Sequence, residues 1–134
     1  MRARCERWPA MLTAFVEAAR ERSFEWGVWD CALAAADWVE VATGIDHAAH
    51  LRDTYSDAHG AARTLAAHGG LEAIATAALG EPISPRMAQR GDLVLVVIEG
   101  RESLCVCVGA AAAGPGPDGL AFPGMDLARL AWHV

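Results

Sequence analysis

The hydrophobic pattern of this chain changes its period once, and that change limits the fold more than any other feature. Before Pro82 the apolar residues recur at helical spacing, in segments separated by glycines and polar loops. After Gly91 and Asp92 the chain reads LVLVVI, a continuous aliphatic run typical of a strand buried on both faces. Helices followed by strands that hairpins can join predict an α+β fold, with a small antiparallel sheet in the C-terminal half. The length of 134 residues predicts a single domain over residues 1–134.

Helices are expected in the first half of the chain. Pro9 suits the first turn of a helix, because a proline there loses no backbone hydrogen bond. Gly44 suits the left-handed residue that ends another helix. The expected helices cover residues 8–22, Cys31 to Gly44, Ser56 or Asp57 to His68, and Leu71 to Leu79, with a polar loop at 45–56.

Strands are expected in the second half. The run 93–98 and the segment 104–108 are predicted to pair as a hairpin around the turn at 99–101. Residues 109–119 are rich in glycine, alanine and proline and are expected to form a loop. A short strand GLAF follows, and the last seven residues alternate apolar with other side chains in the manner of a final strand.

The stretch from Phe24 to Gly44 reads FEWGVWDCALAAADWVEVATG, and it is where we expect chemistry. Asp30 is a good N-cap residue, because its carboxylate can accept the free amide hydrogens of the first helical turn. Cys31 then lies in that first turn, where the positive end of the helix dipole favours a thiolate. A nucleophilic cysteine also needs a general base, so this candidate site depends on a partner from elsewhere in the chain.

Composition and charge argue against several classes of function. The formal net charge is -6 and no basic stripe is visible, which argues against a nucleic-acid partner. The apolar segments are too short for a transmembrane helix, so no membrane insertion is expected. Thr13 and Glu17 interrupt the first of them, which makes it a poor signal peptide. The segment 114–119 lacks the ending of a phosphate-binding loop, and no cofactor is expected.

The cysteines and histidines form no recognised metal motif, so no metal is expected. Cys105 and Cys107 point to one face of their strand and are expected in or near the core in reduced form, like the other two cysteines. His47 and His50 have no cysteine or carboxylate partner at a recognised zinc spacing. The histidines expected at the surface are His47, His50, His59 and His68.

The order of these parts resembles the NlpC-type cell-wall cysteine peptidases, a papain-like superfamily of bacteria and their phages. In that family an aspartate-cysteine pair opens a buried helix, a glycine-aspartate turn leads into a strand, and the next strand begins with the catalytic histidine. The matching pieces of this chain are Asp30-Cys31, Gly91-Asp92-Leu93-Val94 and the segment 104–109. The resemblance implies a papain-like fold, with the N-terminal helices packed on the sheet.

The longer pattern looks still more similar to an uncharacterised NlpC-related family found in tail gene clusters of tailed phages and prophages. That family combines FxWGxxDC with a tyrosine segment, a GD-led strand and a tryptophan near the C-terminus. The corresponding positions are Phe24, Trp26, Gly27, Asp30, Cys31, Gly44, Asp46, Tyr55, Gly91, Asp92, Gly109 and Trp132.

The chain departs from the peptidase pattern at the catalytic base. Counted back from Gly109, the position that should hold histidine falls at Ser103, and no histidine lies between His68 and His133. A serine hydroxyl does not accept a proton from a thiol near neutral pH. His133, the one histidine on an expected strand, is therefore the candidate for a displaced base, and Asp30 is a cap or a helper.

Trp26 and Trp29 flank the turn before Cys31. They either hold this turn against the sheet or line a binding groove for a glycan or a peptide. The first interpretation is favoured for Trp26, and both remain open for Trp29.

The resemblance implies three hypotheses about function. In the leading one, the protein is made in the bacterial cytoplasm and joins other phage tail proteins at the tail tip, where it acts in assembly or docking, with Cys31 as an inherited remnant or a weak thiol. In the second, Cys31 is the nucleophile of an active cysteine peptidase that uses His133 and cleaves peptidoglycan stem peptides. The third is a cytoplasmic protein-binding module with no link to phages.

Overall fold

The computed structural model describes residues 4–134, which form helices first and an antiparallel sheet afterwards. The α-helices are α1 (Trp8–Ala19), α2 (Cys31–Thr43), α3 (Ala58–Ala67) and α4 (Leu71–Leu79). The strands are β1 (Leu93–Ile98), β2 (Arg101–Cys107), β3 (Ala112–Gly116), β4 (Gly119–Ala121) and β5 (Ala128–Trp132). Two short 3-10 helices are η1 (Pro85–Met87) and η2 (Met125–Leu127). This order of elements confirms the α+β fold class.

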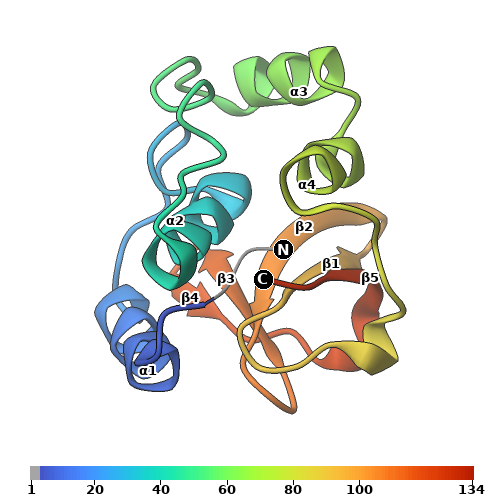
Figure 1. The fold of residues 1–134 in the computed structure, drawn as a ribbon. Coiled ribbons are helices and arrows are strands. Elements are labelled where there is room, and N and C mark those ends of the chain that lie inside the picture. The colour runs from blue at the N-terminus through green and yellow to red at the C-terminus, as the bar shows by residue number, and fades with distance from the viewer. Residues whose placement is uncertain (1–3) are drawn as a thin grey trace.

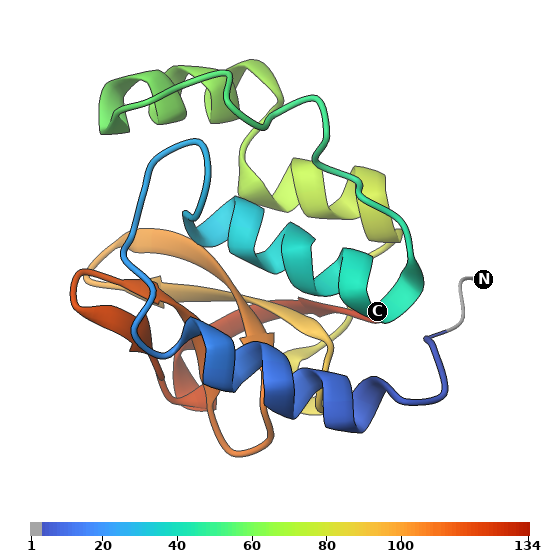
Figure 2. The same cartoon turned by 90° about the vertical axis from the view of Figure 1, so that its left-hand side faces the viewer.

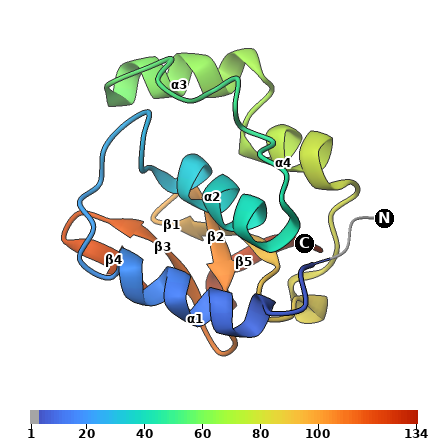
Figure 3. The ribbon, with the colours of Figure 1, turned by 60° about the vertical axis from the view of Figure 1, so that its left-hand side comes forward.

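The helices form a layer over one face of the sheet. In Figure 1 and Figure 2, α2 lies between α1 and α4, and α3 is the outermost helix. Figure 3 shows α2 lying over the middle of the sheet. Most residues of α2 are buried, and many of them are alanines, whose small side chains let this helix approach the strands closely. The expected central helix after Cys31 is thus confirmed.

The five strands follow the order β4-β3-β2-β1-β5, with every neighbouring pair antiparallel. Leu93 and Leu95 of β1 pack with Trp38 of α2 in the main core. Val94 and Val96 of the same strand pack on the opposite face of the sheet. The side chains of η1, η2 and their connections cover that second face, which explains why LVLVVI is apolar without alternation.

The helix expected at residues 8–22 is shorter in the structure. The helix α1 ends at Ala19, and the backbone carbonyl of Arg20 accepts a hydrogen bond of 3.0 Å from the amide of Leu120 in β4. This carbonyl is thus bonded to the sheet, whereas in a longer helix it would accept a hydrogen bond from within the helix.

The cap residues of two other helices are as predicted, because Asp57 caps α3 and Gly44 ends α2 at a φ of 81°.

The prediction of a loop over residues 109–119 was wrong, because this segment contains β3. In β3, Ala112 and Ala113 pair with Cys107 and Val106 of β2. A Cβ atom at Gly114 would lie 2.9 Å from the sulfur of Cys105, so the glycine makes room for a neighbouring side chain. In the sequence these small residues suggested a loop, but in the structure they allow β3 to pack closely against the side chains of β2.

Candidate functional site

Asp30 lies at the centre of the site that the sequence predicted, and it is almost completely buried. One carboxylate oxygen accepts the amide hydrogen of Leu33 at 3.0 Å and caps α2. The other accepts the amide of Gly27 at 3.0 Å and the hydroxyl of Tyr55 at 2.6 Å. These hydrogen bonds confirm the predicted cap and show that Asp30 also joins the turn before the helix to a distant loop.

Gly27 and Tyr55 are in backbone contact, which explains why a glycine precedes Asp30. The backbone of Gly27 has a φ of +83°, and a Cβ atom there would lie only 2.1 Å from the carbonyl oxygen of Tyr55. The carbonyl of Gly27 also accepts a hydrogen bond of 3.0 Å from the amide of Asp53. The spacing WGxxDC and the later tyrosine therefore describe one packed unit. The pattern of the tail-cluster family included Tyr55, but the sequence did not indicate its bond to Asp30.

Cys31 occupies the first turn of α2, as predicted, but its thiol is not activated. Burial is the largest influence and raises the pKa of Cys31 above its ordinary value, and the nearby Asp30 carboxylate acts in the same direction. Hydrogen bonds from the backbone of Leu104 and from the hydroxyl of Ser103 lower the pKa but do not outweigh burial. The residue keeps some exposed surface, yet desolvation of the sulfur decides the direction. Burial therefore disfavours a thiolate at Cys31.

Ser103 is the residue of β2 whose side chain reaches Cys31. The sequence comparison with the peptidases assigned this position to the missing histidine, and the structure places it beside the thiol. Cys105, two residues further along β2, packs with Val94 and Val96 on the other face of the sheet, in the core as expected. The charge of a Cys31 thiolate would raise its pKa, and the Ser103 hydroxyl lowers it.

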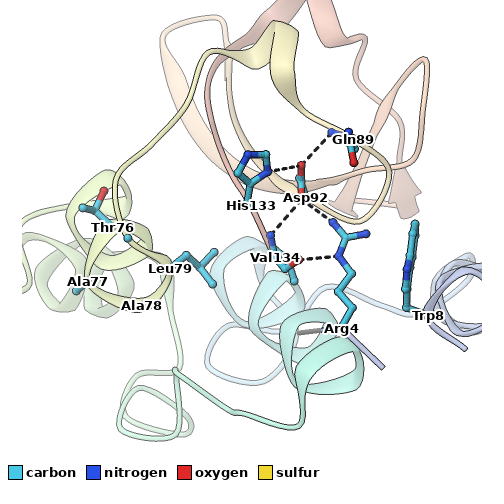
Figure 4. A pocket seen from close by; sticks show the side chains of 11 residues that line it. Arg4, Trp8, Thr76, Ala77, Ala78, Leu79, Gln89, Asp92, His133 and Val134 are labelled. Carbon is cyan, nitrogen blue, oxygen red and sulfur yellow. Dashed lines mark hydrogen bonds and ion pairs between the residues drawn. The ribbon is translucent and has the colours of Figure 1, made fainter. Parts of the chain in front are cut away.

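His133 lies elsewhere and hydrogen-bonds Asp92 through Nδ1, at 3.2 Å (Figure 4). It follows Trp132, which pairs with Leu93, whereas Ser103 pairs with Val96. At about 3.3 Å per residue, His133 is roughly 13 Å along the sheet from the position that faces Cys31. The structure does not bring the predicted displaced base to the cysteine.

The two tryptophans have different surroundings. Trp29 is only 2% exposed and packs with Phe15 of α1 and Leu120 of β4, while Arg22 lies over its ring at 4.1 Å. Trp29 therefore has no surface for a ligand, and the groove prediction was wrong for it. Trp26 is half-buried, with its ring edge-on to Phe24 at 4.7 Å between centroids. Trp29 contacts the sheet through Leu120.

The four described cysteines are free. Among residues 4–134, no three or more side chains of histidine, cysteine, aspartate and glutamate gather closely enough to hold a metal ion. His50, His59 and His68 are exposed as expected, whereas His47 is half-buried because its loop packs Ala48 against α2. Within the same residues, no helix has the length and apolar character needed to cross a membrane.

The fold and this site define an α+β domain with a buried, aspartate-capped helix that presents a neutral thiol to a hydroxyl of the second strand. The chain belongs to the family described as a domain of unknown function (DUF6950), which matches residues 3–134. No curated protein and no solved structure matches the chain.

Proposed function

We propose that this protein is a component of a phage or prophage tail, at the tail tip, and that it acts in assembly or docking. Its domain is of the NlpC type, with an incomplete peptidase dyad. It is made in the bacterial cytoplasm and is then incorporated into the particle, where it binds other tail proteins.

The contact between Ser103 and Cys31 carries this proposal. A cysteine peptidase needs a base beside its nucleophile, and the side chain that reaches this thiol is a hydroxyl. Burial also raises the pKa of Cys31 by more than Ser103 and the backbone of Leu104 lower it, so the surroundings disfavour the thiolate that amide hydrolysis needs. A domain that keeps the helix and strand arrangement without the base is suited to binding.

The surroundings of Asp30 support the same proposal. Its carboxylate accepts hydrogen bonds from the Gly27 amide, the Leu33 amide and the Tyr55 hydroxyl. Asp30 therefore stabilises the fold. The motif that resembles the tail-cluster family therefore has a structural explanation that needs no catalysis.

The location of the protein tests the proposal directly. Particles from a host that encodes this chain should be purified, and their proteins identified by mass spectrometry. We expect the protein in the particles at a constant ratio to a tail structural protein. Detection in the cell lysate alone, with none in intact particles, would contradict the tail assignment and favour the cytoplasmic binding module.

The second test concerns catalysis. The protein should be incubated with purified muropeptides over a range of pH, beside the variants Cys31→Ala and Cys5→Ala. We expect no cleavage that depends on Cys31. Cleavage by the parent protein and by Cys5→Ala, but not by Cys31→Ala, would show an active peptidase and overturn the incomplete-dyad part of the proposal.

A further inference from the structure

Two histidines from different parts of the chain have their rings in contact at the surface. His50 belongs to the loop after α2, and His68 follows the last residue of α3. Their ring centroids lie 5.4 Å apart, with an angle of 50° between the ring planes, and both residues are exposed. Figure 2 and Figure 3 show this loop running back along α3, which brings together two side chains that a whole helix separates in sequence. The pair therefore offers two imidazoles to solvent at one point of the surface.

The hydrogen bond of His68 decides which of its nitrogens can bind a metal ion. Its Nδ1 lies 2.9 Å from the carbonyl oxygen of Thr64, one turn earlier in α3. A carbonyl oxygen can only accept, so Nδ1 carries a hydrogen and the lone pair of the neutral ring is on Nε2. Histidines that bind metals in proteins almost always make such a second bond, because it fixes the ring and its tautomer. His68 is thus prepared as a ligand through Nε2.

The backbone at both histidines is held in place. Around His50, the amide of Leu51 donates to the carbonyl of Ala48 at 2.9 Å, and these two residues pack against α2. The amide of His68 donates to the carbonyl of Leu65 at 3.1 Å. Because the turn and the helix end are already ordered, the two rings lose little further freedom when they share one ligand.

The separation of the rings suits a single metal ion. Histidine nitrogens bind zinc at about 2.1 Å in a tetrahedral arrangement, which puts the centroids of two such imidazoles roughly 5.3 Å apart. The 5.4 Å between His50 and His68 is close to this value, so binding needs no movement of the backbone. Among residues 4–134, no third side chain of histidine, cysteine, aspartate or glutamate completes the site. Water then occupies the other coordination positions.

The charges around the pair favour a cation. The cationic residue nearest to His50 in the chain is Arg52, which two carboxylates neutralise in ion pairs of 2.7 and 2.9 Å. On α3, Arg63 precedes His68 by five positions, so the two residues project from nearly opposite sides of the helix. The C-terminal end of α3 adds the negative end of a helix dipole, and the chain as a whole has a formal charge of -6.

We propose that His50 and His68 together bind one divalent transition-metal ion of the zinc type through their imidazole nitrogens. Imidazole suits zinc, nickel and copper, whereas magnesium and calcium prefer oxygen ligands. The bound ion joins the loop after α2 to the end of α3. The pair shares no residue with the site around Asp30 and Cys31, so this inference does not rest on the tail assignment.

Titration of the isotope-labelled protein with Zn²⁺ tests the proposal. It is carried out with the cysteines reduced at about pH 7.5, where histidines are ordinarily neutral, and the ring resonances of each histidine are followed by NMR. We expect the rings of His50 and His68 to shift together and to saturate before those of His59 and His133. Mg²⁺ at the same concentration should leave all of these resonances unchanged.

Single substitutions test whether both rings bind the same ion. His50→Ala and His68→Ala should each weaken Zn²⁺ binding about tenfold or more, because the remaining imidazole loses a second ligand held at high effective concentration. The matched control His59→Ala removes an exposed histidine of α3 outside the pair and should leave the affinity unchanged. The amide spectrum of each variant reports whether the fold is kept.

Three results would overturn the proposal. The first is separate titration of the two rings, with different midpoints or with no shift of either ring while Zn²⁺ binds elsewhere. The second is the affinity of the parent protein in a folded His50→Ala or His68→Ala variant. The third is displacement of Zn²⁺ by an equal concentration of Mg²⁺. The ring resonances of the parent protein decide the question even if a variant does not fold.

Discussion

The hydroxyl of Ser103 lies near enough to the thiol of Cys31, where β2 passes the first turn of α2, to lower the pKa of that thiol. Burial raises the same pKa by more, so the net direction is upward. A helix N-terminus alone therefore does not produce a thiolate when the sulfur is desolvated.

Replacing Ser103 should change the reactivity of Cys31 in opposite directions for two substitutions. Ser103→His provides an imidazole near the thiol, and we expect alkylation of Cys31 by iodoacetamide at neutral pH to accelerate about tenfold or more. Ser103→Ala removes the hydroxyl that lowers the pKa of Cys31, so alkylation should slow. Peptide mass spectrometry reports Cys31 separately from the other cysteines. Equal rates in a folded Ser103→His variant would mean that the site cannot orient a base.

Stability should fall at alkaline pH because of the buried thiols. Burial, with a contribution from the Cys31 thiol, raises the pKa of Cys105 to about 12. An ordinary thiol of the unfolded chain ionises near about pH 8.5, so above this pH the unfolded state loses a proton that the folded state keeps. The stability is complete below about pH 8.5 and is lost progressively toward pH 12, by up to ~1.4 kcal/mol per pH unit for one thiol.

Urea unfolding at several alkaline pH values measures this dependence. Cys105→Ala should give a shallower decline of the free energy of unfolding than the parent protein. Val106→Ala is the matched control, since it shortens a buried side chain of the same strand without removing a thiol. It should lower the stability at every pH and keep the slope of the parent. A parallel slope in Cys105→Ala would contradict the assignment to this thiol.

Two glycines with the same backbone conformation should respond differently to alanine. Gly27 and Gly44 have φ values of +83° and +81°, so both substitutions carry the cost of a left-handed alanine, about 1 kcal/mol. At Gly27 the new Cβ would also meet the Tyr55 carbonyl at 2.1 Å, whereas at Gly44 nothing lies within 4 Å. We expect Gly27→Ala to cost ~3 kcal/mol or more in chemical denaturation. Similar losses in both variants would show that the turn can move away from Tyr55.

The bond between Tyr55 and Asp30 should be measurable by a double-mutant cycle. Tyr55→Phe removes a hydrogen bond to a buried carboxylate and should cost ~1–2 kcal/mol. Asp30→Ala also removes the cap of α2 and the partner of the Gly27 amide, so its cost should be larger, ~3 kcal/mol. The double variant should lose about 1 kcal/mol less than the sum. Strict additivity of the two free energies would mean that the hydroxyl and the carboxylate are not coupled.

Local signals in the sequence were sufficient where one residue type has one dominant role. Asp30 was identified as a helix cap, Gly44 as a left-handed end, and the run from Leu93 as a strand buried on both faces. The loop prediction for residues 109–119 failed because small residues are ambiguous. They favour turns when exposed, but in β3 they are required by the sulfur of Cys105.

The sequence by itself determined the fold class and the capped helix that begins at Cys31. Only the tertiary structure decided that burial raises the pKa of Cys31, that Tyr55 bonds to Asp30, and that His133 bonds to Asp92. The pKa of a thiol depends on how much water its neighbours exclude, and those neighbours come from β2, far along the chain. Arg4 and Asp92 are separated by 88 positions, and a local sequence pattern does not indicate a hydrogen bond between residues so far apart.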